Sequence, residues 1–276
     1  MTRIAVDDGV RYEVREGGAG PALLLLHGFA GRSAIWAPFE PAFRARHRTI
    51  AVDLLGHGGS DRPSDPARHA VERQAADLAA LLERVGAVPA AVVGYSFGAR
   101  IALRLALDHP ATVERLLLES PSAGVPDPAA RAARREADER WATLIETGGI
   151  EAFADAWEAQ PLFASRHRLP DDERRRWREI VVANRPGALA ASLRGAGQGA
   201  MEPLLERLPQ IRQPTLVVAG ALDEVGLGRA REIAGRLPNA RLEIVPDAGH
   251  APHLEAPVTF RRVVVEFLMP AVEVAP

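Results

Sequence analysis

Residues 90–100, AAVVGYSFGAR, contain the residue types of a serine-based catalytic element. An apolar, β-branched run is followed by Gly94-Tyr95-Ser96-Phe97-Gly98, which is a G-x-S-x-G motif. Between a strand and a helix this motif forms a sharp turn, and its glycines keep Cβ atoms away from the serine. The stretch therefore predicts a nucleophile elbow with Ser96 held out at one edge of a sheet. The free N–H groups of the following helix would favour negative charge on a bound substrate oxygen.

A catalytic serine needs a base and an acid that orients the base, and the second half of the chain supplies both. Asp223 follows the apolar run 214–219, and His250 follows the run 240–245. Each is expected just past the carboxyl end of a strand, at the edge of the sheet that carries Ser96. We predict that His250 accepts the proton of Ser96 and that Asp223 orients the imidazole.

Other acidic and basic side chains near these positions leave alternatives. Asp247 is too near His250 in sequence to orient it from another loop, and Glu224 is expected to point away. Glu119, at the end of an earlier predicted strand, remains an alternative acid, and His253 is a neighbouring rival base. The remaining histidines are expected at the surface: His47, His69, His109 and His167.

A glycine-rich loop at 27–31 adds a second catalytic feature. The continuous apolar run 22–26 predicts a strand buried on both faces of a sheet, and it ends in HGFAG. In serine hydrolases, a loop N–H at this position and the N–H after the nucleophile together hold an oxyanion. We therefore expect the N–H groups of Phe29 and Phe97 to form an oxyanion hole.

The order of elements predicts an α/β fold with a mostly parallel, doubly wound sheet, because strands alternate with helices of ten or more residues. A hairpin of edge strands is expected at 4–15, and a helix at 34–45. Residues 124–208 are mostly helical in pattern and include three of the four tryptophans. We predict that they form a helical lid inserted into a core made of 1–123 and 209–276.

Composition narrows the class of protein. The 276 residues are 47% hydrophobic and 25% charged, with a formal net charge of −2, which predicts one soluble globular unit and neither nucleic-acid nor membrane partners. The absence of cysteine excludes disulfides and thiolate metal sites, and the histidine spacing gives no metal site. No cofactor is expected. The acidic N-terminus predicts a cytoplasmic protein, and the oligomeric state stays open.

Over nearly its full length the chain resembles the α/β-hydrolase superfamily. Several stretches resemble one branch, the 2-succinyl-6-hydroxy-2,4-cyclohexadiene-1-carboxylate synthases of menaquinone biosynthesis. The stretches are HGFAG (27–31), GYSFGAR (94–100), LLLESPSAG (116–124), AWEAQPLFAS (156–165), LAASLRGAGQGA (189–200) and AGHAPHLEAP (248–257). The resemblance implies elimination of pyruvate from an enolpyruvyl-bearing cyclohexene carboxylate, with the triad acting as base.

The resemblance also implies a binding site for several carboxylates. Arg100 and Arg134 fall where this family binds them, Tyr95 and Trp157 match its pocket aromatics, and Arg194 lies in a matching lid motif. Guanidinium groups suit this task because they bind carboxylates through two parallel hydrogen bonds.

Three departures from the family pattern bear on the substrate. A further family arginine falls near Val182, so Arg178 or Arg185 would have to replace it. The sequence after Asp223 is EVGLG where a lysine and an aromatic are expected, and Ala99 replaces a glycine. A carboxylesterase or carbon–carbon bond hydrolase with Ser96 as covalent nucleophile is therefore an alternative, and a non-enzymatic ligand sensor is a second one.

Overall fold

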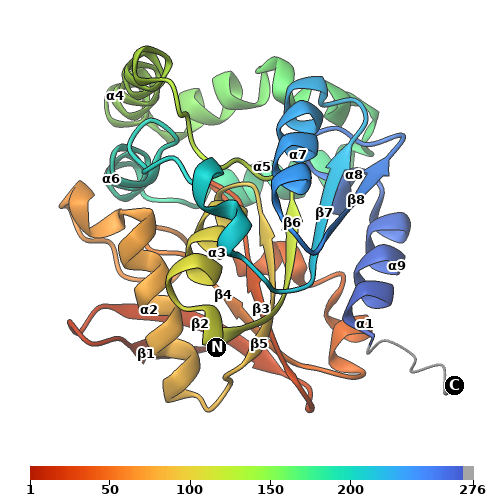
Figure 1. Cartoon of the computed structure of the whole chain (residues 1–276). Helices are drawn as coiled ribbons and strands as arrows, with labels where there is room; N and C mark the ends of the chain where they lie inside the picture. Colours follow the sequence, from red (N-terminus) through yellow and green to blue (C-terminus); the bar gives the residue numbers. More distant parts are fainter. Residues whose placement is uncertain (270–276) are drawn as a thin grey trace, which may run out of the picture.

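The computed structural model describes residues 1–269, and within them eight strands form one sheet in the order β1-β2-β4-β3-β5-β6-β7-β8. The strands are β1 (Thr2–Ala5), β2 (Arg11–Gly17), β3 (Ala22–Leu26), β4 (Arg48–Val52), β5 (Ala90–Tyr95), β6 (Val113–Glu119), β7 (Thr215–Gly220) and β8 (Ala240–Val245). Strand β2 is antiparallel to β1 and to β4, and every other pair is parallel. The predicted α/β fold class is confirmed (Figure 1).

Helices cover both faces of this sheet. They are α1 (Glu40–Arg44), α2 (Val71–Arg84), α3 (Phe97–Asp108), α4 (Pro128–Glu158), α5 (Asp171–Val182), α6 (Pro186–Ala196), α7 (Glu224–Arg236), α8 (Pro252–Glu255) and α9 (Pro257–Leu268). Leu78 of α2, Ile101 of α3 and Ile233 of α7 belong to the core on one face. Phe43 of α1 and Phe260 of α9 belong to the core on the other.

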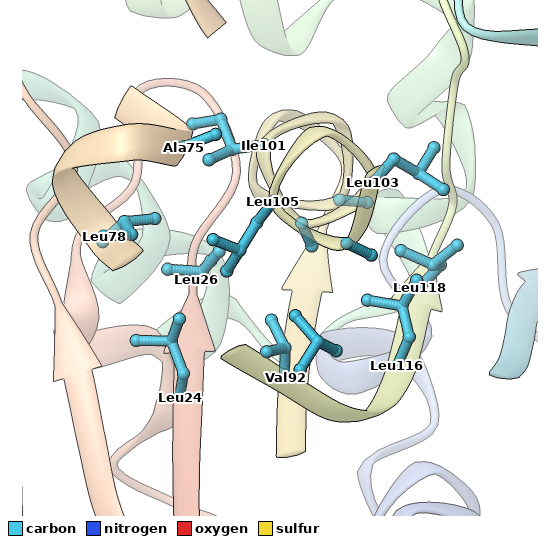
Figure 2. Packing of buried hydrophobic residues seen from close by; sticks show 14 of the residues in the cluster. Leu24, Leu26, Ala75, Leu78, Val92, Ile101, Leu103, Leu105, Leu116 and Leu118 are labelled. Atoms are coloured by element: carbon cyan, nitrogen blue, oxygen red, sulfur yellow. The ribbon is translucent and has the colours of Figure 1, made fainter. Parts of the chain in front are cut away.

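Alternation along β3 shows how one strand supplies both cores. Leu24 and Leu26 pack under α2 and α3, as Figure 2 shows, whereas Leu23 and Leu25 belong to the opposite core. All five residues of the strand are buried. A continuous apolar run is therefore what this central parallel strand requires, because neither face meets water.

Two predicted elements differ in the structure. The helix expected at 34–45 is instead a 3₁₀ helix, Ser33–Trp36, followed by a turn and then α1. Pro38 and Pro41 explain the break, because a proline has no N–H with which to continue the helical hydrogen bonds. Strand β2 is not an edge strand, because the chain returns through β4 to pair with it on its second side.

Residues 120–214 connect β6 to β7 and contain no strand within the described part of the chain. Helices α4, α5 and α6 of this helical insertion lie together beyond the carboxyl ends of the parallel strands (Figure 1). Gly149, at φ 83° and ψ 172°, interrupts α4 with a kink. Among residues 1–269, no helix has the length and apolar character needed to cross a bilayer.

Short 3₁₀ helices complete the chain outside the sheet. Besides the one before α1, they are Pro66–His69, Pro110–Thr112, Pro161–Arg168 and Leu205–Gln210. His69 ends the first of these and is fully buried, so the prediction of a surface histidine is wrong there. Its Nε2 donates to the carbonyl of Pro63 at 2.8 Å, whereas its Nδ1 is buried without a hydrogen-bond partner among the described residues.

Candidate active site

The turn between β5 and α3 holds Ser96 in a strained backbone conformation, with φ 49° and ψ −100°. The glycines beside it are required by close packing of the chain. A Cβ on Gly94 would lie 2.6 Å from the carbonyl oxygen of Gly98, and a Cβ on Gly98 would lie 2.6 Å from that of Leu26. The side chain of Ser96 is consequently held at the carboxyl edge of the sheet and remains partly exposed.

The structure brings Ser96, His250 and Asp223 together in one chain of hydrogen bonds. Nε2 of His250 lies 3.0 Å from Oγ of Ser96, and Nδ1 lies 2.7 Å from Oδ2 of Asp223. A carboxylate can only accept, so Nδ1–H donates to it and Nε2 is left to accept from the serine hydroxyl. This tautomer allows His250 to act as a base toward Ser96.

Asp223 is held ionised by its surroundings. Burial alone would raise the pKa of the Asp223 carboxyl, but hydrogen bonding to His250, the electrostatic interaction with that ring and the N–H of Gly226 together lower it below its usual value. The Gly226 N–H donates to Oδ1 at 2.8 Å. The second oxygen therefore stays directed at His250 as a negative charge that can stabilise an imidazolium.

The loop that carries His250 is fixed by a residue that sequence reasoning missed. Glu255, at the end of α8, accepts from the N–H of Gly249 at 2.8 Å and from that of Ala251 at 3.0 Å. The carboxylate thus binds the backbone on both sides of the histidine. Ser120 Oγ donates to the carbonyl of His250 at 2.8 Å. The signal in the sequence was an acidic residue, Glu255, in the first turn of a helix that begins with Pro252.

Glu119, the alternative acid, serves a different histidine. It is fully buried, and its Oε1 accepts from the backbone N–H of His253 at 2.8 Å and from Nδ1 of the same ring at 2.9 Å. The ring of Tyr95 lies against His253, with centroids 4.6 Å apart. Glu119 and His253 therefore form a buried pair behind the site and do not replace Asp223 or His250.

Two buried histidines hold the glycine-rich loop after β3. His27 Nε2 accepts from the N–H of Leu54 at 2.9 Å, and His57 Nε2 accepts from the N–H of Ala30 at 3.2 Å. Burial lowers the pKa of both rings, and the neighbouring His27 lowers that of His57 further. Both rings are consequently neutral acceptors, and they fix the loop that carries Phe29, which lines the cavity described below together with Ser96.

These rings predict how stability depends on pH. In the folded protein the pKa of both rings is below the ordinary 6.5. As the pH falls past 6.5, these two histidines therefore bind protons in the unfolded chain but not in the folded one. The free energy of unfolding, measured by urea denaturation, should be steady above pH 6.5 and decrease between 6.5 and about 5, by up to about 1.4 kcal/mol per pH unit for each ring. His57→Gln should reduce this slope, whereas the exposed control His167→Gln should retain it. A stability unchanged between these pH values would contradict neutral buried rings.

A cavity of about 110 Å³ opens beside Ser96 and His250. Arg100, Arg134 and Arg229 contribute to its lining, and among the described residues no aspartate or glutamate does. The other lining residues are mainly aromatic, serine and glutamine side chains, including Tyr95 and Trp157, Phe29 and Phe163, Ser120 and Ser122, and Gln160 and Gln198. A larger hollow of about 790 Å³ elsewhere contains neither Ser96 nor His250. The positive charge and the position beside the serine define the smaller cavity as the candidate site.

Arg100 is buried at the wall of this cavity. Its Nη1 donates to the carbonyl of Ala196 at 2.7 Å, and its guanidinium lies 5.0 Å from the ring centre of Phe97. Burial and the positive charge of Arg134 lower the pKa of Arg100 to about 9, so it is protonated at neutral pH. A buried cation without a carboxylate partner is costly, and an anionic ligand would relieve that cost.

Arg194 is not part of this cavity, so the structure contradicts its predicted place. It forms ion pairs with Glu139 at 2.7 Å and with Glu146 at 2.6 Å on the outside of the insertion. Both carboxylates belong to α4, which is distant from Arg194 in the sequence. A motif around Arg194 does not reveal such long-range contacts. Arg194 is therefore already paired with two carboxylates of the protein, and it does not belong to the candidate site.

The two arginines expected to replace the missing family arginine are also elsewhere. Arg178 pairs with Glu151 and Asp155, each at 2.7 Å, and Arg185 borders a different surface hollow. The third cation of the cavity is Arg229 of α7, which sequence reasoning missed. No local pattern distinguishes it from the other arginines of the sequence.

Fold and site geometry together define a class of protein. Residues 21–257 match the α/β-hydrolase fold family, and the chain belongs to this family. It is 39% identical, over 96% of its length and 97% of the relative, to a Bacillus subtilis (strain 168) protein named as a 2-succinyl-6-hydroxy-2,4-cyclohexadiene-1-carboxylate synthase. The family resemblance predicted from the motifs is confirmed.

Other relatives show a wider range of chemistry. The chain is 34% identical, over 95% of its length and 96% of the relative, to a Caulobacter sp. (strain K31) protein named as the carbamate hydrolase RutD. Among solved structures it is similar to MenH from S. aureus, with a TM-score of 0.89, 30% identity, and coverage of 93% of this chain and 97% of that one. Similarity alone thus defines the family and favours a MenH-like role, but it does not choose between elimination and hydrolysis.

Proposed function

We propose that this protein is a lyase that eliminates pyruvate from 2-succinyl-5-enolpyruvyl-6-hydroxy-3-cyclohexene-1-carboxylate. The observation that carries the proposal is the cluster of Arg100, Arg134 and Arg229 beside the hydrogen-bonded serine. The substrate has three carboxylates, one each on the succinyl group, the enolpyruvyl group and the ring. A neutral ester has no group that would pair with such a cationic cavity. The similarity to the named synthase and to MenH supports the same conclusion.

In this mechanism Ser96 and His250 move a proton. The ring C–H bond breaks, and its proton passes to the Ser96–His250 pair while Asp223 stabilises the positive charge on the imidazole. The electron pair of the broken C–H bond forms an enolate-like intermediate, and the N–H groups of Phe29 and Phe97 hold the oxygen of this intermediate. The C–O bond to the enolpyruvyl group then breaks with its electron pair, and protonation of this leaving group gives pyruvate. The product gains the second ring double bond.

The helical insertion acts as a lid in the proposed cycle. A cavity of about 110 Å³ is smaller than the roughly 300–1,000 Å³ of typical ligand pockets, so the substrate needs a wider site. Arg134 and Trp157 come from α4, on opposite sides of the kink at Gly149. Movement of α4 would widen the cavity for binding and then return both side chains to the substrate.

The alternative function is ester or carbon–carbon bond hydrolysis with Ser96 as covalent nucleophile. The same hydrogen-bonded serine and histidine would perform it, and the relative named as a carbamate hydrolase supports it.

A comparison of two substrates tests the proposal. Pyruvate release from the enolpyruvyl substrate should have a kcat/KM far above that for hydrolysis of p-nitrophenyl acetate, because only the first substrate engages the arginines. Rapid ester turnover without pyruvate release would contradict the lyase and support the alternative.

A further inference from the structure

Arg229 is an exposed residue of α7 whose side chain lines the active-site cavity. Helix α7 begins directly after Asp223, and both Gly226 and Arg229 line the cavity. These positions are three residues apart and therefore share one face of the helix. Gly226 is required there, because a Cβ would lie 2.1 Å from Oδ2 of Asp223. Arg229 is thus the first residue with a side chain on this face.

The surroundings of Arg229 leave its charge unmatched. Within residues 1–269 it forms no ion pair, and the carboxylate whose charge acts on it, Asp223, is paired with His250 at 2.7 Å. Burial and the charge of Arg134 lower the pKa of Arg229, whereas Asp223 raises it. The side chain therefore has room and charge for an anion from outside the protein.

We propose that Arg229 is a specificity-determining residue that binds one carboxylate of a tricarboxylate substrate. This inference rests on the proposed function and assigns a third carboxylate contact to the core of the fold. Arg100 on α3, Arg134 on α4 and Arg229 on α7 approach the cavity from three separate elements. A ligand with carboxylates at three separated positions can pair with all of them, whereas a monocarboxylate cannot.

Substitution of Arg229 tests the assignment with a matched control on the same helix. Like Arg229, Arg231 is exposed and forms no ion pair within the described residues, but it does not line the cavity. Arg229→Gln should raise KM for pyruvate release by about 10-fold or more with a much smaller change in kcat, because it removes binding rather than chemistry. Arg229→Lys should recover part of the loss, and Arg231→Gln should behave like the unchanged protein. Hydrolysis of p-nitrophenyl acetate should be unchanged in Arg231→Gln.

Calorimetric binding of propane-1,2,3-tricarboxylate separates this inference from the proposed function. The Kd should rise by about 10-fold or more in Arg229→Gln and stay unchanged in Arg231→Gln, whether or not pyruvate is released. If no pyruvate forms but this difference in Kd persists, the lyase is wrong and the carboxylate contact stands. Equal KM and equal Kd in the two glutamine variants would overturn the role of Arg229, as would the absence of both pyruvate release and tricarboxylate binding.

Discussion

Ser96→Ala and His250→Ala should each lower kcat/KM for pyruvate release by about 10³-fold or more without unfolding the protein. The serine supplies the hydroxyl and the histidine the base, and the two are joined by one hydrogen bond of 3.0 Å. Removing either group leaves the other without a partner for proton transfer. Steady-state kinetics on purified variants measures the loss, and thermal unfolding at unchanged Tm shows that the fold is intact.

The double variant of Ser96 and His250 is the sharper part of this prediction. Because the two residues act as a unit, its activity should be little lower than that of either single variant. Losses that multiply independently would contradict a shared proton-transfer step.

Arg100→Ala should cost about 2 to 4 kcal/mol in kcat/KM for the carboxylate substrate. Its guanidinium is buried at the wall of the cavity and pairs with no carboxylate of residues 1–269, so a substrate carboxylate is expected to supply a partner. Arg100→Lys should recover only part, because an ammonium group cannot form the two parallel hydrogen bonds of a guanidinium.

A neutral ester provides the control for Arg100, since the side chain also contacts the protein. Its Nη1 donates to Ala196 at 2.7 Å, so alanine also removes a structural hydrogen bond. The rate on p-nitrophenyl acetate should change little if the main role is carboxylate binding. Equal losses on the charged and the neutral substrate would assign Arg100 a structural role instead.

Local sequence predicted the elements of the sheet because each strand carries its own signal. The runs at 22–26, 113–119 and 240–245 coincide with β3, β6 and β8, as expected for strands with continuous or alternating apolar residues. Ser96, Asp223 and His250 could be found for a related reason. Each lies within five residues of the end of a recognisable strand, and parallel strands bring their carboxyl ends to one edge of the sheet.

Which distant side chains form ion pairs with one another could not be predicted in the same way. Arg194 and Arg229 look alike in sequence, yet one is neutralised by Glu139 and Glu146 while the other borders the cavity. Which arginine is free depends on how the insertion and α7 pack, and no local pattern encodes that. The buried position of His69 has the same origin, because its surroundings come from long-range packing.

Mass spectrometry of enzyme quenched during turnover tests the central claim most directly. An esterase must form an acyl-enzyme on Ser96, whereas an eliminating enzyme uses this residue only to move a proton. The sample should be quenched while the enolpyruvyl substrate is being consumed and pyruvate is measured in parallel. We expect steady pyruvate release from a protein of unmodified mass. A substrate-derived adduct on Ser96 at substantial occupancy, or turnover without pyruvate, would contradict it.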